Sequence, residues 1–310
     1  MADYTLRQLE YFIAVAEAGS VTGAARRMHL SQSAMSTALS DLERALGVQL
    51  VTRHHARGIT VTAAGLDLLS SARALLRQAQ ELETTAGQLG GEAGRVTLGC
   101  FAVLCPYVLP TVLAEARKAL PDVELVTSEE SLDGLSDGLR EGRLELTLGY
   151  GLGRPAGVTH TSLYSVSPHV VLPVDHRLAQ RRSITLKQLE GEPMVLLDLP
   201  HSRDYFAGLF AASGITPVVR YRTHSAETAR ALVARGLGYT VLNLQADRHV
   251  SLDGLPYAVL PLGAHLPQGE SELEVVLGSA ENTRLTRRAQ AVADLCIRVL
   301  KQSQRRPRLG

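Results

Sequence analysis

Residues 19–36 read GSVTGAARRMHLSQSAMS and decide the fold of the N-terminal part. Ser20 and Ser31 can each cap a helix, because a seryl oxygen accepts backbone N–H groups that the first turn leaves free. Ala24 and Ala25 lie in the first of these helices, and small side chains let a second helix approach closely. After Ser31, apolar residues recur at spacings of three and four: Met35, Ala38, Leu39, Leu42, Ala45 and Leu46. The stretch therefore predicts two packed helices joined by a turn.

The flanking residues extend this pattern on both sides. Thr5 and Gln8 form a capping box ahead of an apolar stripe, which predicts a helix that Gly19 ends. After Gly47, residues 48–50 and 59–61 are expected to form short strands on either side of a basic hairpin. Residues 1–62 thus predict a winged helix-turn-helix domain.

The helix that follows Ser31 has a polar face opposite its apolar stripe. Such a helix can enter the major groove of double-stranded DNA, while arginines of the hairpin contact phosphates. The chain has 32 Lys and Arg against 31 Asp and Glu, so any basic surface must be local. From these residues alone, a solvated polar face with scattered arginines fits equally well. The candidate DNA contacts are Gln32, Ser33, Ser36, Thr37, Ser40, Arg53 and Arg57.

A heptad pattern follows in residues 63–90. Leu68, Leu75 and Leu82 recur every seven residues, and Ala72 and Ala79 lie between them at spacings of four and three. The helix would be roughly 40 Å long, and a lone rod between domains has nothing in its own chain to cover that seam. A second copy would cover it, so these leucines are candidate dimerisation residues. The alternative is a surface helix packed on a neighbouring domain.

Residues 94–310 alternate between strand and helix patterns. Three strands and two helices come first, and a second set of strands and helices follows. The last strand and helix do not obviously extend the second set, so we expect them to complete the first. The predicted α/β domain therefore has two subdomains, about 94–163 plus 267–302 and about 164–266.

In such sheets, ligands bind beyond the carboxyl ends of the strands, where helix N-termini offer free N–H groups. Basic and hydroxyl side chains at these places favour an anion, most plausibly a carboxylate with an apolar body. Glu129 and Glu130 leave open the alternative of an amine or a neutral molecule. The candidate ligand contacts are Phe101, Ala102, Val103, Ser128, Tyr150, His201, Ser202, Arg203, Thr223 and His224.

The run at 19–36, with LERALGVQL at 42–50, Arg53 and TAAG at 62–65, resembles the N-terminal signature of LysR-type transcriptional regulators. The resemblance continues with a linker helix and an effector-binding region similar to type 2 periplasmic binding proteins, including residues 176–179 and 232–238. Val51 and Arg177 depart from the family's usual Phe and Pro. The resemblance implies a DNA-binding regulator whose action depends on a small effector, and dimers that assemble into tetramers. The other class that fits is a small-molecule-binding protein or enzyme of periplasmic-binding fold with an N-terminal assembly domain.

Other motifs are weak. Three cysteines in 310 residues do not make a disulfide framework, which favours the cytoplasm, and no apolar run is long enough to span a membrane. Cys100 and Cys105 are better explained as buried thiols than as a redox pair. Glycines at 149–153 lack the spacing of a dinucleotide site, and the histidines lack metal-ligand spacing. We expect no enzymatic activity, no metal and no cofactor.

Overall fold

The computed structural model describes residues 3–54, 58–87, 94–153, 155–244, 246, 248–263, 272–281 and 283–303. The N-terminal domain contains α1 (Leu6–Ala18), α2 (Val21–Arg27), α3 (Gln32–Leu46), β1 (Val51–His54) and β2 (Gly58–Val61). The capping box of Thr5 and Gln8 starts α1, and Ser20 and Ser31 cap α2 and α3. The three helices pack around one apolar core.

The wing differs from the expectation at its first strand. Residues 48–50 are not a strand, and β1 begins only at Val51. The reason is Glu43, whose Oε1 accepts the backbone N–H groups of Leu50 at 2.8 Å and Val51 at 3.2 Å. A carboxylate on α3 therefore accepts the hydrogen bonds of backbone N–H groups that were expected to pair with the second wing strand. From Val51 on, β1 pairs antiparallel with β2.

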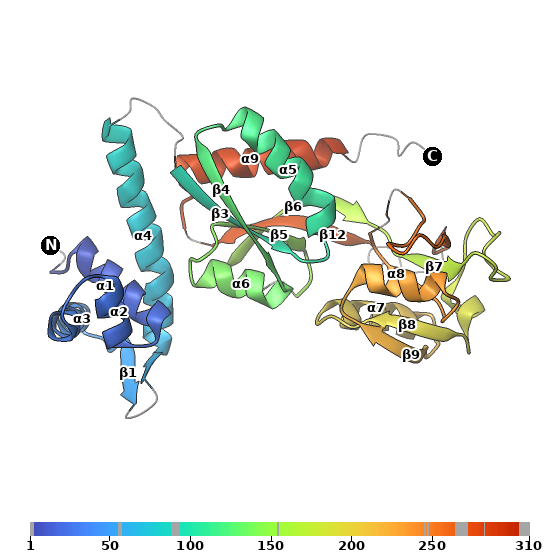
Figure 1. The fold of residues 1–310 in the computed structure, drawn as a ribbon, viewed down its shortest axis with the longest axis horizontal. Helices are drawn as coiled ribbons and strands as arrows, with labels where there is room; N and C mark the ends of the chain where they lie inside the picture. Colours follow the sequence, from blue (N-terminus) through green and yellow to red (C-terminus); the bar gives the residue numbers. More distant parts are fainter. Residues whose placement is uncertain are drawn as a thin grey trace.

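The long helix α4 (Ala63–Gly87) follows β2 and stands beside α1 as a rod (Figure 1). The sequence predicts that no other part of the chain covers the heptad seam of α4. This prediction is wrong for the first half of the helix. Ala72 is buried and Leu68 packs against the core of the N-terminal domain, whereas Leu75 is 43% exposed. The reason is that α1 packs along α4. The side chain of Leu82 lies outside the described part of α4.

The first lobe of the C-terminal region is an α/β unit. Its strands are β3 (Gly94–Phe101), β4 (Val123–Glu130), β5 (Leu146–Tyr150), β6 (Val158–Val166) and β12 (Leu273–Ala280), in the order β4-β3-β5-β12-β6. Strand β12 runs antiparallel to both of its neighbours, whereas β3 is parallel to β4 and β5. Helices α5 (Cys105–Ala119) and α9 (Arg287–Ser303) lie on one side of this sheet and α6 (Leu132–Arg140) on the other (Figure 1).

The second lobe has its own smaller sheets. Strands β7 (His169–Pro173), β10 (Thr240–Leu242) and β11 (Tyr257–Pro261) form one, and β8 (Pro193–Leu197) and β9 (Val218–Thr223) form another. A parallel bridge between Met194 and Tyr239 connects the two. Helices α7 (Ser202–Ala212) and α8 (Ala226–Ala234) and the short 3-10 helix η1 (Leu186–Leu189) complete the lobe. No helix in the described ranges is long and apolar enough to cross a membrane.

Candidate nucleic-acid interface and ligand cleft

The start of α3 presents the predicted polar face to solvent. Ser31 Oγ accepts the backbone N–H of Ala34 at 3.1 Å and lies 3.0 Å from Ser33 Oγ. On the other side of α3, Met35, Leu39 and Leu42 are buried against α1 and α2. The predicted apolar stripe is wrong at Ala45, which is exposed, and Ala38 and Leu46 are half-buried. Of the five predicted contacts on this helix, Ser36 is half-buried and the remaining four are exposed: Gln32, Ser33, Thr37 and Ser40.

Fewer arginines remain available for phosphates than the sequence suggests. Arg27 pairs with Glu17 at 3.0 Å, and Arg44 pairs with Asp41 at 2.8 Å. Arg53 is exposed on β1 and forms no ion pair with another described residue. Of the two predicted wing contacts, Arg53 therefore presents a free positive charge, and Arg57 lies outside the described residues.

A cavity of about 340 Å³ lies between the two lobes. The chain that follows β3 and the N-terminal turn of α6 form one wall, and the N-terminal turn of α8 with Leu199 and Pro200 forms the other. This outer cavity is lined mainly by apolar groups, with acidic side chains at Glu130, Asp133 and Glu227. Four of the predicted ligand contacts line it: Phe101, Ala102, Val103 and His224.

A smaller inner cavity of about 20 Å³ lies next to the outer one, and Val103, Tyr107 and Ala226 line both. Its volume suffices for one water-sized group. Besides Val103, the predicted contacts Tyr150 and Ser202 line it. Tyr150 packs edge to face on Phe101, with ring centroids 5.6 Å apart.

The sequence-based candidates omit several polar residues of the inner cavity: Tyr107, Tyr205, Arg230 and Asn243. Arg230 on α8 is only 1% exposed; its Nη1 donates to Glu227 Oε1 and its Nη2 to the carbonyl oxygen of Leu244. Asn243 is 8% exposed, and its Oδ1 has no hydrogen-bond partner among the described residues. Arg230 falls four residues after Ala226 and three before Val233, so its place on the buried stripe of α8 was a signal available in the sequence.

The tyrosines around the inner cavity keep their protons at neutral pH. Burial raises the pKa of Tyr205 to about 12, although a hydrogen bond with Asn243 opposes this shift. Burial also raises the pKa of Tyr150. Both rings are therefore neutral phenols, so the inner cavity combines one buried cation with uncharged polar groups.

The remaining predicted ligand contacts line neither of these two cavities. His201 Nε2 instead lies 2.7 Å from Asp133 Oδ1 and joins the second lobe to the first, with a left-handed backbone φ of 61°. Arg203 is exposed and pairs with Asp198 at 3.3 Å. Thr223 Oγ1 accepts the N–H of Ser225, and Ser128 Oγ is buried without a described partner.

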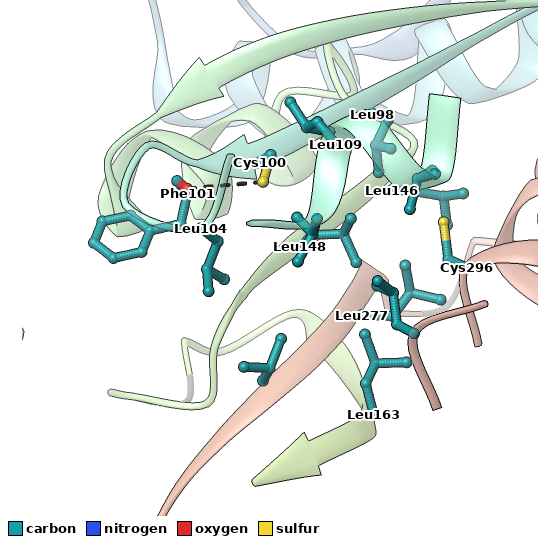
Figure 2. Packing of buried hydrophobic residues seen from close by; sticks show 14 of the residues in the cluster. Leu98, Cys100, Phe101, Leu104, Leu109, Leu146, Leu148, Leu163, Leu277 and Cys296 are labelled. Atoms are coloured by element: carbon teal, nitrogen blue, oxygen red, sulfur yellow. Dashed lines mark hydrogen bonds between the residues drawn. The ribbon is translucent and has the colours of Figure 1, made fainter. Parts of the chain in front are cut away.

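The cysteines are free and buried, and Figure 2 shows Cys100 and Cys296 among the leucines of the first lobe. Hydrogen bonding with Cys105 and burial raise the pKa of the Cys100 thiol, and burial raises that of Cys296 to about 12. Cys105 Sγ lies 3.4 Å from the carbonyl oxygen of Phe101. The residues that the structure describes contain no group of three or more His, Cys, Asp or Glu placed to hold a metal ion.

A winged helix-turn-helix joined by a long helix to two lobes with a cavity between them defines a ligand-responsive transcriptional regulator. Residues 6–66 match the family described as bacterial regulatory helix-turn-helix protein, lysR family, and residues 89–301 match the LysR substrate binding domain. The chain therefore belongs to the LysR family of transcriptional regulators.

Individual relatives agree with this assignment. The Hca operon transcriptional activator HcaR of Escherichia coli is 33% identical over 246 residues, which cover 76% of this chain and 81% of that protein. The hydrogen peroxide-inducible genes activator of Dickeya chrysanthemi is 30% identical over 255 residues, covering 81% and 83%. The crystal structure of HinK, a LysR family transcriptional regulator from Pseudomonas aeruginosa, has a TM-score of 0.65 at 32% identity and covers 97% of this chain and 99% of its own.

Proposed function

We propose that the protein binds operator DNA as a dimer and inserts the N-terminal half of α3 into the major groove. The observations that carry this proposal are the exposed polar face of α3 and the exposed Arg53 of the wing, which forms no ion pair with another described residue. Hydroxyl and amide side chains hydrogen-bond to base edges, and wing arginines contact phosphates. Gln32, Ser33, Ser36, Thr37 and Ser40 take the first role and Arg53 and Arg57 the second.

In this proposal the chain divides into a DNA-binding domain (1–62), a linker helix (63–90) and an effector-binding domain (94–310). Leu68, Leu75 and Leu82 form the dimerisation seam, although only Leu75 is well exposed among the two leucines whose side chains are described. Two dimers then assemble into a tetramer. The three free cysteines and the DNA partner suit the cytoplasm, and we assign the protein no catalytic activity.

The ligand acts by changing how the dimers are arranged on DNA. Binding between the lobes can do so only if the ligand has different affinities for the two arrangements, because equal affinity shifts no equilibrium. The outer cavity suits this role because its walls come from different lobes. Hydrogen bonding with Cys100 lowers the pKa of Cys105, but all three thiols are buried, and this burial argues against the peroxide response for which the Dickeya relative is named.

The test is DNA binding by fluorescence anisotropy over a salt series, with a duplex selected from a random library by the full-length protein. Arg53→Ala should weaken binding to all duplexes and reduce the salt slope by about one. Ser33→Leu with Ser36→Leu should abolish preference for the selected duplex. Arg143→Ala, which removes an exposed arginine of the first lobe, is the matched control and should change neither quantity. Unchanged binding in both sets of variants would refute the groove assignment.

A further inference from the structure

We infer that the effector is a carboxylate whose anionic group takes the place of Glu227 on the buried guanidinium of Arg230. The inference rests on the proposed function, because it assumes that the cavity between the lobes is the effector site. It assigns the site a chemical class and names an internal carboxylate as the competitor of the ligand.

The first observation is the asymmetry of the ion pair. Arg230 is 1% exposed, whereas the side chain of Glu227, three residues earlier on α8, is 37% exposed. A buried cation without a partner is strongly unfavourable, so Arg230 must always contact an anion. The carboxylate of Glu227, in contrast, can rotate into water without losing solvation. Exchange of one carboxylate for another therefore keeps Arg230 paired throughout.

The second observation is the position of the pair between the two cavities. Glu227 lines the outer cavity and Arg230 lines the inner one. When Glu227 moves away, the outer cavity opens directly onto the guanidinium. The apolar body of a ligand would remain in the outer cavity, beside Phe101 and Leu199.

The third observation is the acceptor at the back of the inner cavity. Asn243 Oδ1 is buried without a described partner, and the cavity there has room for one water-sized group. A hydroxyl or ammonium group on the carbon next to the ligand carboxylate matches this space and donates the missing hydrogen bond. The favoured ligands are therefore 2-hydroxy- and 2-amino-carboxylates.

The other carboxylates of the outer cavity do not require a cationic ligand. Asp133 already contacts His201 Nε2 at 2.7 Å, and it lies in the first turn of α6. Glu130 precedes Ser131, the N-cap residue of that helix. The N-terminus of a helix stabilises negative charge, so the start of α6 favours both carboxylates and His201 of the second lobe adds a contact to Asp133. Arg230 is the charged group whose partner can be exchanged.

The experiment is chemical rescue in the full-length protein. Glu227→Ala removes the internal carboxylate, and thermal unfolding is then followed with propionate, lactate, alanine or propanamide at equal ionic strength. Propionate should raise the Tm of Glu227→Ala by several degrees more than it raises that of the parent protein, and propanamide should have no such effect. Lactate or alanine should raise it further than propionate. The added gain should vanish when Asn243→Leu is combined with Glu227→Ala.

Asp137→Ala is the matched control, because it removes the acid of an exposed i,i+3 pair with Arg140 on α6 and should show no rescue. If Glu227→Ala does not fold, Glu227→Gln provides the test by calorimetry. Its affinity for lactate should exceed that of the parent by about tenfold, the factor expected when a charged competitor becomes a neutral one, and misfolding cannot raise an affinity. Equal rescue by propanamide, or unchanged lactate affinity in Glu227→Gln, would overturn the inference.

DNA-binding measurements on the parent protein and the same variants distinguish a failure of the ligand assignment from a failure of the proposed function. If the parent binds its selected duplex but the variants show no carboxylate effect, the ligand assignment is wrong and the proposed function stands. If carboxylates rescue Glu227→Ala but the parent protein binds no duplex, the exchange at Arg230 stands and the proposed function fails.

Discussion

The contact between α4 and the first lobe offers a quantitative test of the structure. Arg77 Nε lies 3.4 Å from Glu145 Oε1, and Arg77 Nη1 donates to the carbonyl oxygen of Gly142 at 2.8 Å. The two charged side chains are 21% and 4% exposed. Burial raises the pKa of Glu145, and the positive charge of Arg77 opposes this shift. Arg77→Met keeps an apolar side chain of similar reach but removes the main cation beside a buried carboxylate.

Breaking a buried ion pair from one side costs about 3–5 kcal/mol. The lower end applies here, because the backbone N–H of Thr97 still donates to Glu145 Oε2 at 3.3 Å and Arg288 still lowers the pKa of this carboxyl. We therefore expect Arg77→Met to lower the free energy of unfolding by about 3 kcal/mol near pH 8. A carboxyl whose pKa is raised by folding destabilises the folded state above its unfolded pKa, and protonation removes this cost. Without Arg77 the pKa rises further, so the loss should shrink towards about pH 5.

Urea unfolding followed by circular dichroism measures this loss at both pH values. Glu145→Gln combined with Arg77→Met should recover part of the stability lost near pH 8, because the buried carboxylate is gone. The recovery is partial because the buried Arg288 then loses the nearby negative charge and keeps its hydrogen bond to the carbonyl oxygen of Arg95. Arg143→Met, at an exposed pair with Glu141, should change stability by about 0.5 kcal/mol or less. If Arg77→Met costs the same at both pH values, or the double variant is no more stable than the single one, Glu145 is not the buried partner that the structure shows.

Two further predictions concern assembly and the thiols. Leu75→Glu should lower the mass measured by sedimentation and should weaken DNA binding by removing the second half-site. Leu66→Glu, at a similarly exposed α4 position outside the heptad seam, is the control and should keep the parental mass. A parental mass for Leu75→Glu would contradict the assignment of Leu75 to a dimer seam. Because Cys100, Cys105 and Cys296 are buried, a thiol reagent should label the folded protein far more slowly than the protein in urea, and rapid labelling of the folded form would contradict the packing in Figure 2.

The N-terminal domain could be predicted in detail because its signals are local. Ser20 and Ser31 cap the helices that the sequence predicts, and Gly19 and Gly47 adopt the left-handed backbone that ends a helix. The predicted start of the first wing strand is wrong because it depends on Glu43, seven residues before Leu50, whose carboxylate accepts the backbone N–H of Leu50. The spacing of apolar residues does not predict such a side-chain contact with the backbone.

The location of the cleft could be predicted from the sequence, but only some of the residues that line it could. The rule that ligands bind beyond strand ends finds Phe101, Val103 and Tyr150, because these positions follow from strand order alone. The same rule selects Arg203 as the cation, and the structure instead pairs it with Asp198 at the surface. Arg230 lies one turn inside α8, so only the orientation of that helix brings its guanidinium to the cavity.

The long helix α4 shows why a heptad pattern alone gave an incomplete view of the linker. Arg73, on this helix, donates through Nη2 to Glu17 of α1 at 2.9 Å and through Nη1 to the carbonyl oxygen of Glu141 at the end of α6 at 2.5 Å. One guanidinium thus contacts the DNA-binding domain and the first lobe together, and Arg77 adds a second contact on the same side. A large change in the angle between α4 and the first lobe would separate the donors and acceptors of these contacts. A ligand between the lobes can therefore change the position of α3 only by favouring an arrangement that offsets the loss of these contacts. Helix α4 is thus a structural connection between the two domains, in addition to its proposed role as the surface that a second copy covers.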